Sequence, residues 1–153
     1  MLSVRPQGNF VHIREAELSD SDALAELVET LGYSADEAQM TDRLPPILAH
    51  PDYRTVVATL DDQVVGLIGL QIAFRYEEAG KYVRILILAT NPSVNRKGIG
   101  TALITAAERF AQAEGAKMLV ANSGLLRDAA HSFYTSCGFE RLSYGFYKSV
   151  AAA

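Results

Sequence analysis

The sequence predicts a single domain of mixed α/β (α+β) architecture, and three observations lead to this prediction. Its 153 residues are about the length of one domain, and its 49% hydrophobic content can fill a core. β-Branched and aromatic runs separated by turn-like residues occupy residues 53–90, as in a three-stranded meander. A segment with helical periodicity follows and begins at two glycines, Gly98 and Gly100. We therefore expect one domain over residues 1–153, with its core at about 10–150.

A strand and a helix are expected first. Residues 10–17, FVHIREAE, alternate as a strand does. Ser19 and Asp22 have the spacing of a capping box and predict the start of a helix that ends at Gly32. The apolar face of this helix is expected to consist of Leu24, Leu27, Val28 and Leu31.

A second helix is predicted from another capping-box pattern, Ser34 with Glu37. Pro45 and Pro46 are expected to break or restart this helix, because proline lacks the N–H that an internal turn needs.

The segments after the meander alternate between helix and strand. In the first helix of this part, a buried stripe is expected at Ile99, Leu103, Ala106 and Phe110. The order of the segments is a helix over 100–115, a strand over 117–122, a short helix over 127–137 and a terminal hairpin over 139–150.

The composition argues against several classes of protein. The formal net charge is −4 and the pI is about 5.3, whereas nucleic-acid-binding domains are usually basic. The longest apolar run, ILILA, is far shorter than the roughly 18 to 20 residues of a membrane span. The first residues lack the apolar stretch of a secretory signal, and the single cysteine, Cys137, cannot form an intramolecular disulfide. We expect a cytoplasmic protein that binds neither nucleic acid nor membrane.

Glycines and cations meet in the stretch NPSVNRKGIGTALI, residues 91–104, between a strand and a helix. The first N–H groups of a helix lack intrahelical partners and carry the positive end of the helix dipole. Gly98 and Gly100 allow a ligand to approach the backbone closely, and Arg96 and Lys97 add positive charge. These features predict an anion site, most often one for phosphate.

Two well-known phosphate motifs do not fit this stretch. The spacing of a P-loop is absent, and the third glycine of a dinucleotide fingerprint is replaced by Leu103. An ordinary tight turn between strand and helix remains as an alternative.

RKGIGTALI, residues 96–104, resembles motif A of the GCN5-related N-acetyltransferase (GNAT) superfamily, which reads [Q/R]-x-x-G-x-[G/A]. AAHSFYTSCGFE, residues 129–140, is similar to its motif B, A-x-x-[FL]-Y-x-x-x-GF. The resemblance extends over about residues 10–150. It implies a GNAT fold, with a mixed central sheet of about six to seven strands flanked by about four helices, and acetyl-CoA as co-substrate.

The resemblance also implies how acetyl-CoA is bound. Backbone amides of motif A would hold the pyrophosphate, although Asn95 stands where the family has Gln or Arg, and Arg96 could compensate. The strand before motif A would contact the pantetheine arm, and Asn122 would line the gap where two central strands separate. Arg127 is either a phosphate contact or a surface residue. The cofactor-binding residues expected in this way are Leu88, Ala89, Thr90, Asn95, Arg96, Lys97, Gly98, Ile99, Gly100, Thr101, Asn122 and Arg127.

Acetyl transfer to an amine needs a neutral nitrogen and a proton for the leaving thiolate. By resemblance, Tyr134 is the candidate general acid, although it also fits a core aromatic position. The family often has a glutamate near the position of Ile87, and no acid occurs there. The general base is therefore left open between Glu77, Glu78, His131 and a water relay.

The acceptor is expected to be a primary amine on a small molecule or a peptide, and its identity is undetermined. Acidic side chains in the segments that build acceptor pockets could hold a cationic amine or could simply be solvated. One alternative is an inactive acetyl-CoA-binding sensor or interaction domain, and a homodimer is kept as an open option. These acidic side chains are Asp36, Glu37, Asp42, Glu77 and Glu78.

Overall fold

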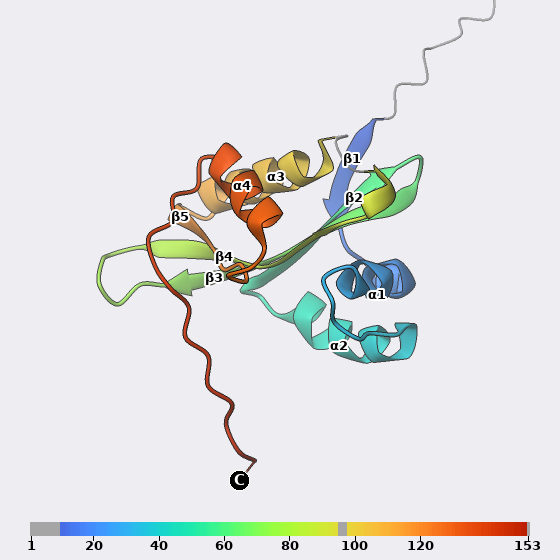
Figure 1. The fold of residues 1–153 in the computed structure, drawn as a ribbon, viewed down its shortest axis with the longest axis horizontal. Helices are drawn as coiled ribbons and strands as arrows, with labels where there is room; N and C mark the ends of the chain where they lie inside the picture. The colour runs from blue at the N-terminus through green and yellow to red at the C-terminus, as the bar shows by residue number, and fades with distance from the viewer. Residues whose placement is uncertain (1–9, 95–97, 153) are drawn as a thin grey trace, which may run out of the picture. The chain divides into compact units, whose positions relative to one another are not determined.

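The computed structural model describes residues 10–94 and 98–152 (Figure 1). These residues divide into two compact units, the first ending at Ala121 and the second beginning at Asn122. No helix in the described part of the chain is long and apolar enough to cross a bilayer.

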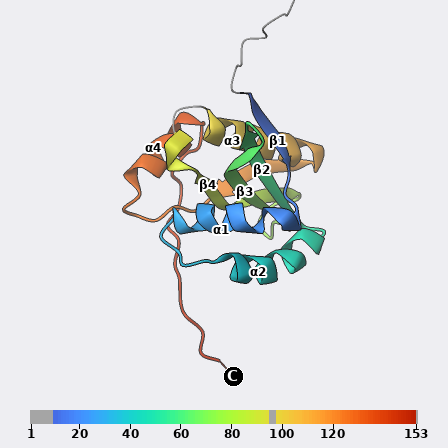
Figure 2. The same cartoon turned by 90° about the vertical axis from the view of Figure 1, so that its right-hand side faces the viewer.

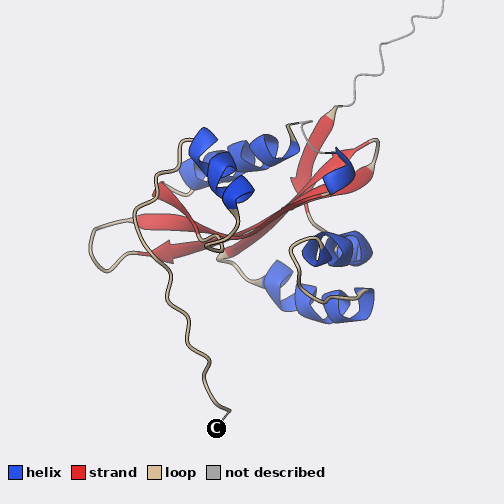
Figure 3. Ribbon diagram, in the orientation of Figure 1, coloured by secondary structure: helices blue, strands red, loops and turns tan. Residues whose placement is uncertain are grey.

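The first unit is built on a five-stranded mixed sheet, in the spatial order β1-β2-β3-β4-β5. Figure 3 draws its strands in red and the helices in blue. All neighbouring pairs are antiparallel except β4 and β5, which run parallel. The mixed α/β class is confirmed, but the described residues form five strands and not six to seven. The strands are β1 (Val11–Glu15), β2 (Tyr53–Leu60), β3 (Gln63–Phe74), β4 (Lys81–Thr90) and β5 (Ala116–Ala121).

Helices cover both faces of this sheet. In Figures 1 and 2, α1 and α2 lie against one face and α3 against the other. The helices of the first unit are η1 (Leu18–Asp20), α1 (Ser21–Glu29), α2 (Glu37–Ala49), η2 (Pro92–Val94) and α3 (Ile99–Ala113).

The predicted core residues of α1 and α3 are each confirmed in part. Leu24, Leu27 and Val28 are buried, as expected from their spacing, whereas Leu31 lies beyond the end of α1 at Glu29 and is only half-buried. In α3 the buried residues are Ile99, Leu103, Ile104, Ala107 and Ala111. Ala106 and Phe110, which were expected in the stripe, are only half-buried. The periodicity therefore predicted the helix correctly but not the whole of its buried face. Small alanines occur on several faces of α3, so the apolar spacing did not define one face.

Both predicted capping boxes are displaced. Glu17 donates its backbone N–H to the carboxylate of Asp20 at 2.8 Å, so the first cap precedes Ser19 and Asp22. Asp20 is buried and also accepts two 2.8 Å hydrogen bonds from the guanidinium of Arg14 on β1. These bonds hold the pKa of Asp20 below its usual range, although burial opposes them. The capping box therefore lies at η1, directly before α1, and its carboxylate is also bonded to a strand residue.

The second cap is formed two residues later than predicted. Asp36 accepts a 2.8 Å hydrogen bond from the N–H of Gln39, whose side chain bonds back to Asp36. The helix then continues through Pro45 and Pro46 to Ala49, so the expected break is wrong. Both prolines are exposed, as are the residues four positions earlier, so water can solvate the carbonyl groups that they leave unpaired. Leu44 on the opposite face stays buried.

The predicted meander is confirmed. Asp61 and Asp62 both have positive φ, 50° and 61°, between the paired residues Leu60 and Gln63. A two-residue turn of this kind matches the twist of the strands that it joins.

Gly66 on β3 fixes the close approach of α3 to the sheet. A Cβ atom at Gly66 would lie 2.7 Å from Cγ2 of Ile99 and 3.0 Å from Cδ1 of Leu103. Gly66 is also the register partner of Thr90, at the end of β4. The start of α3 is therefore packed directly over the end of β4.

Gly66→Ala is expected to destabilise the fold by about 1–3 kcal/mol, because the added methyl group must displace the branched side chain of Ile99. Urea unfolding would measure this change. Gly124→Ala is the matched control, because its added Cβ would meet Arg127 Cδ at 3.6 Å, an ordinary contact. Equal stability of the two variants would show that α3 can move away from the sheet without cost.

The second unit contains α4 (Asp128–Ser136), which agrees with the predicted helix over 127–137. Residues 139–152 form no strand, so the predicted terminal hairpin is wrong within the described residues. Gly145, in the middle of the expected hairpin, does not have positive φ. The alternating apolar pattern of a strand is present, but the described part of the chain supplies no partner strand.

Candidate active site

The site begins where β4 and β5 separate. Their parallel pairing ends at Ile85 on β4 and Ala121 on β5. The remaining residues of β4 pair with β3 alone among the described residues, while the strand continues to Thr90. This half of β4 therefore presents backbone N–H and C=O groups along an open edge.

A bulge marks the point of separation. Gly69 on β3 pairs with Ile87, and the next residue, Leu70, pairs with Ile85, which leaves Leu86 as the extra residue. Leu86 is 46% exposed, although it lies in the middle of a central strand. A bulge bends its strand and increases the local twist. The bulge at Leu86 comes directly after Ile85, the last residue of β4 that pairs with β5.

The predicted strand contacts lie on this open segment. Leu88 and Thr90 are half-buried, whereas the side chain of Ala89 is buried in the core with α1 and α2. Ala89 can therefore meet a ligand through its backbone only. An elongated ligand with amide groups would add to this edge as a further strand does.

The N-terminus of α3 lies next to the end of β4. Gly98 is the N-cap residue, with φ 75° and ψ 17° in the left-handed region that favours glycine. No described side chain caps the helix there, and no described atom lies within 4 Å of a Cβ built at Gly98. The first helical bond runs from Ala102 N–H to the Gly98 carbonyl at 2.9 Å.

The amides before Ala102 are therefore without intrahelical acceptors, as at any helix start. They belong to Ile99, Gly100 and Thr101, three of the predicted cofactor-binding residues. Ile99 is 3% exposed, so its side chain anchors the helix and only its amide can serve a ligand. Asn95, Arg96 and Lys97 lie outside the described residues.

Tyr134 in the second unit lies on α4, half-buried between two aromatic rings. The ring of Phe139 meets it edge-on at 5.3 Å, and that of Phe133 lies at 5.7 Å. Burial raises the pKa of Tyr134 above its ordinary value, and the cation of Arg127 opposes this by a smaller amount. The phenol therefore stays protonated at neutral pH, as a proton donor must.

Other candidates in the second unit are now located. His131 places Nε2 2.8 Å from the carbonyl oxygen of Gly124, and its Nδ1 lies 3.5 Å from the guanidinium of Arg141. Both ring nitrogens are thus engaged, which argues against a role as base. Arg127 is the N-cap residue of α4, and Asn122 lies directly after β5 with its side-chain nitrogen 3.3 Å from a Cβ built at Gly145.

Glu77 and Glu78 are exposed in the turn between β3 and β4. Both pair with Arg75, at 3.9 Å and 3.2 Å. The guanidinium side chain is only 14% exposed, whereas the carboxylates are 71% and 62% exposed. Both carboxylates therefore have a structural role in this turn, as ion-pair partners of Arg75.

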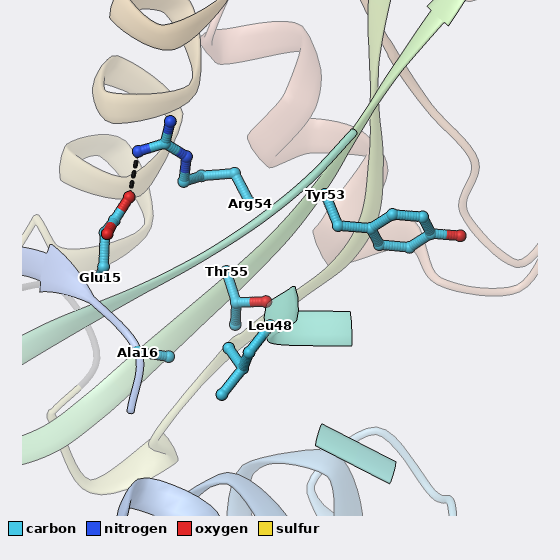
Figure 4. A pocket seen from close by; sticks show the side chains of 6 residues that line it. All are labelled: Glu15, Ala16, Leu48, Tyr53, Arg54 and Thr55. Carbon is cyan, nitrogen blue, oxygen red and sulfur yellow. Dashed lines mark hydrogen bonds and ion pairs between the residues drawn. The ribbon is translucent and has the colours of Figure 1, made fainter. Parts of the chain in front are cut away.

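A separate hollow of about 240 Å³ lies where β1 ends and β2 begins (Figure 4). Its charges are paired, because Glu15 forms an ion pair with Arg54, whose guanidinium also lies 4.8 Å above the ring of Phe110. No sequence pattern indicated this hollow, since residues 15–16 and 48–55 are far apart in the chain. Tyr53 in this hollow pairs with Gln71, toward the end of the sheet opposite Thr90. The lining residues are Glu15, Ala16, Leu48, Tyr53, Arg54 and Thr55.

The separated strands and the glycine-opened helix start define the class of site. An extended ligand can lie along the open edge of β4, and its anionic part can bind to the free amides of α3. Acetyl-CoA has this composition, with a pantetheine arm that carries amides and a pyrophosphate. The open space at Gly98 fits a phosphate group close to the backbone.

Comparison with known proteins identifies the family. A model of the acetyltransferase (GNAT) family matches residues 21–139. An aminoalkylphosphonate N-acetyltransferase from Salmonella typhimurium is 27% identical over 139 residues, which cover 90% of each chain. The chain therefore belongs to the GNAT acetyltransferase family. It is an N-acetyltransferase that uses acetyl-CoA.

Solved structures share this fold. A GNAT family acetyltransferase from Staphylococcus aureus is 26% identical, with a TM-score of 0.79 over 92% of this chain and 98% of the other. An aminoglycoside N-acetyltransferase in complex with CoA is 16% identical, with a TM-score of 0.85 over 97% of this chain and 100% of the other. The predicted family, class of enzyme and co-substrate are confirmed.

Proposed function

We propose that the protein transfers the acetyl group of acetyl-CoA to a primary amine, by direct attack within a ternary complex. The observation that carries this proposal is the open edge of β4 beside the uncapped N-terminus of α3. We further propose that the two units act as one catalytic domain over residues 1–153, because the family match runs through both of them.

The first unit supplies the binding residues in this proposal. Backbone amides of Gly98, Ile99, Gly100 and Thr101 hold the pyrophosphate, and Leu88–Thr90 hold the pantetheine arm. The positive end of the α3 dipole adds to the attraction for the two phosphates. Asn95, Arg96, Lys97, Asn122 and Arg127 are proposed as further contacts.

The bound thioester supplies an activated acyl group. The bulge at Leu86 leaves backbone amides of β4 available to the carbonyl oxygen as it gains negative charge. The neutral amine adds to the carbonyl carbon, and the C–S bond then breaks. Tyr134 gives its phenolic proton to the departing thiolate, which leaves as the CoA thiol. After it has added, the positively charged nitrogen releases one proton to water, and water returns a proton to the Tyr134 phenolate, so that the products are the N-acetyl amide and the CoA thiol.

The acceptor amine must lose a proton before it attacks, because an alkylamine has a pKa near 10.4. The carboxylates of Glu77 and Glu78 are paired with Arg75, and both nitrogens of His131 have partners. We therefore favour release of the proton to water in the open site over transfer to one of these side chains.

The double variant Glu77→Gln/Glu78→Gln is expected to keep kcat/KM within about twofold of the wild type, as for exposed side chains away from the chemistry. The measurement is the release of CoA thiol at several pH values. A rate that fell tenfold or more and no longer increased with pH would show that one of the two carboxylates is the base.

The function is tested by thiol release with a panel of amines. The panel starts with aminoalkylphosphonates and aminoglycosides, the acceptors in the names of the similar proteins. Thermal unfolding with acetyl-CoA, CoA, ATP and NAD is measured beside it, and a ligand at 100 times its Kd should stabilise by about 2.7 kcal/mol. Stabilisation by acetyl-CoA without transfer to any amine would favour a binding module, and stabilisation by ATP or NAD alone would contradict the cofactor site.

A further inference from the structure

A row of polar side chains crosses three strands of the sheet. Gln71 on β3 pairs with Tyr53 on β2 and with Arg84 on β4. Directly paired residues point to the same face of a sheet, with Cβ atoms roughly 5 Å apart. All three side chains are half-buried. We call these three residues the polar row.

The polar row lies on the face that α1 and α2 cover. Leu67 on β3 is buried in the core with these helices, and Ile87 on β4 packs against the same core. Every second residue of a strand shares a face, so Gly69 and Gln71 follow Leu67 on this side. Ile87 pairs with Gly69, and the polar row is therefore the next row along the sheet.

The bulge at Leu86 brings Arg84 to the same face as Ile87. Residues three positions apart in a regular strand point to opposite faces. Because Leu86 is an extra residue, the partners of Arg84 and Ile87 are two positions apart on β3 and share a face. Arg84 is therefore beside the bulge, whose backbone amides are proposed to bind the acetyl carbonyl.

The acceptor amine has access from this face. α3 lies against the other face of the sheet (Figure 1), and the proposed pyrophosphate position is at its start. Acetyl-CoA therefore occupies the α3 side of the open β4 edge, which leaves the α1–α2 side to the acceptor. The polar row is thus on the acceptor's side of the sheet.

The charge of the polar row is that of the Arg84 guanidinium, which lies 5.7 Å from the ring centre of Tyr82. Tyr82 is two positions before Arg84 and shares its face. A guanidinium that stacks on a ring still has a planar fork of N–H donors for a carboxylate, phosphonate or phosphate. The Tyr53 hydroxyl and the Gln71 amide supply further donors.

The acidic side chains expected to hold a cationic amine lie outside this row. Asp36 accepts the capping bond of α2, and Glu77 and Glu78 pair with Arg75. The other two are exposed on α2. The polar row therefore favours an anionic group on the acceptor over a second cationic one.

We propose that Arg84 binds an anionic group of the acceptor, with Gln71 and Tyr53 as supporting donors. The acceptor is then a short amine that also carries a phosphonate, phosphate or carboxylate group. Successive rows are about 6.5 Å apart along a strand, so only a few carbon atoms separate the amine at the bulge from the anion at Arg84. This assignment rests on the proposed acetyl transfer and names its class of acceptor.

The test compares 2-aminoethylphosphonate, β-alanine and propylamine, which have similar chain lengths and differ in the terminal group. The wild type should prefer an anionic amine, and its choice between the first two identifies the anion. Arg84→Gln should lower kcat/KM for that amine by about tenfold or more, mainly through KM, as for a lost hydrogen bond to a charged group. For propylamine the change should stay within about twofold. Arg84→Lys should restore part of the loss, because lysine keeps the charge without the fork.

Lys81→Gln is the matched control, because Lys81 is a cation on the same strand but on the opposite face. Its Nζ lies 5.7 Å from the ring centre of Phe74, its partner on β3. This variant should keep the preference for the anionic amine. An unchanged thermal response to acetyl-CoA would show that each variant is folded and binds the co-substrate.

An equal loss for charged and uncharged amines in Arg84→Gln would overturn the assignment, as would a wild type that prefers propylamine. Binding of 2-aminoethylphosphonate and β-alanine to the protein–CoA complex, measured by calorimetry, separates this assignment from the proposed function. Binding that depends on Arg84, without transfer to any amine, would support the anion site and contradict the transfer. Transfer that does not depend on Arg84 would contradict the anion site alone.

Discussion

Gly98→Asp is expected to weaken acetyl-CoA binding by roughly 100-fold or more, since like charges in contact cost several kcal/mol and each 1.4 kcal/mol is about tenfold. Gly98 begins α3 with φ 75°, in open space beside the uncapped amides. A carboxylate there would occupy the proposed pyrophosphate position and would itself cap the helix. Calorimetric titration with acetyl-CoA measures the change.

Gly98→Asn separates charge from backbone strain. Asparagine has nearly the shape of aspartate, tolerates positive φ and carries no charge. It should lose less than about tenfold in affinity, the order of the strain cost for a residue other than glycine. If both variants bind acetyl-CoA like the wild type, the pyrophosphate does not bind at the start of α3.

Tyr134→Phe is expected to lower kcat by about 100-fold, at the low end of the effect of removing a general acid. The Kd for acetyl-CoA should change little, because phenylalanine keeps the packing against Phe133 and Phe139. Rapid-mixing measurement of thiol release, with Kd measured separately, gives both quantities.

The pH profile supplies a second readout for Tyr134. Because burial raises the pKa of Tyr134, the protonated donor persists until the pH exceeds its ordinary value of about 10, and the rate falls only above that. Tyr134→Phe should lose this alkaline decline. A variant that keeps both kcat and the decline would exclude Tyr134 as the acid. Thr135→Ser, an exposed neighbour on α4, serves as control and should leave kcat unchanged.

Local patterns in the sequence were sufficient for most of the elements. The apolar spacing of α1, the two aspartates of the β2–β3 turn and the limits of α4 all depend on residues close in the chain. The same holds for the glycine that opens α3, because a left-handed cap is a local requirement. The start of the candidate site was therefore predictable.

Contacts between distant residues corrected the remaining predictions. Asp20 closes the capping box of η1 with Glu17, and Arg14, on a strand, holds the same carboxylate. The prolines of α2 are tolerated because they lie on the solvent face while Leu44 packs inward. No local pattern predicts the position of this cap or the continuation of α2 through its prolines. Both depend on which side of the element meets the rest of the fold.

The sequence by itself determined the family, the co-substrate and the glycine-opened helix start, because motif spacing and backbone freedom are properties of short segments. Only the tertiary structure placed the bulge at Leu86 and ended the β4–β5 pairing at Ile85. It also showed that the described residues 139–152 form no strand, although their sequence predicted a hairpin. Strand register and strand pairing depend on residues far apart in the chain, so the opening that receives a ligand could not be located from the sequence.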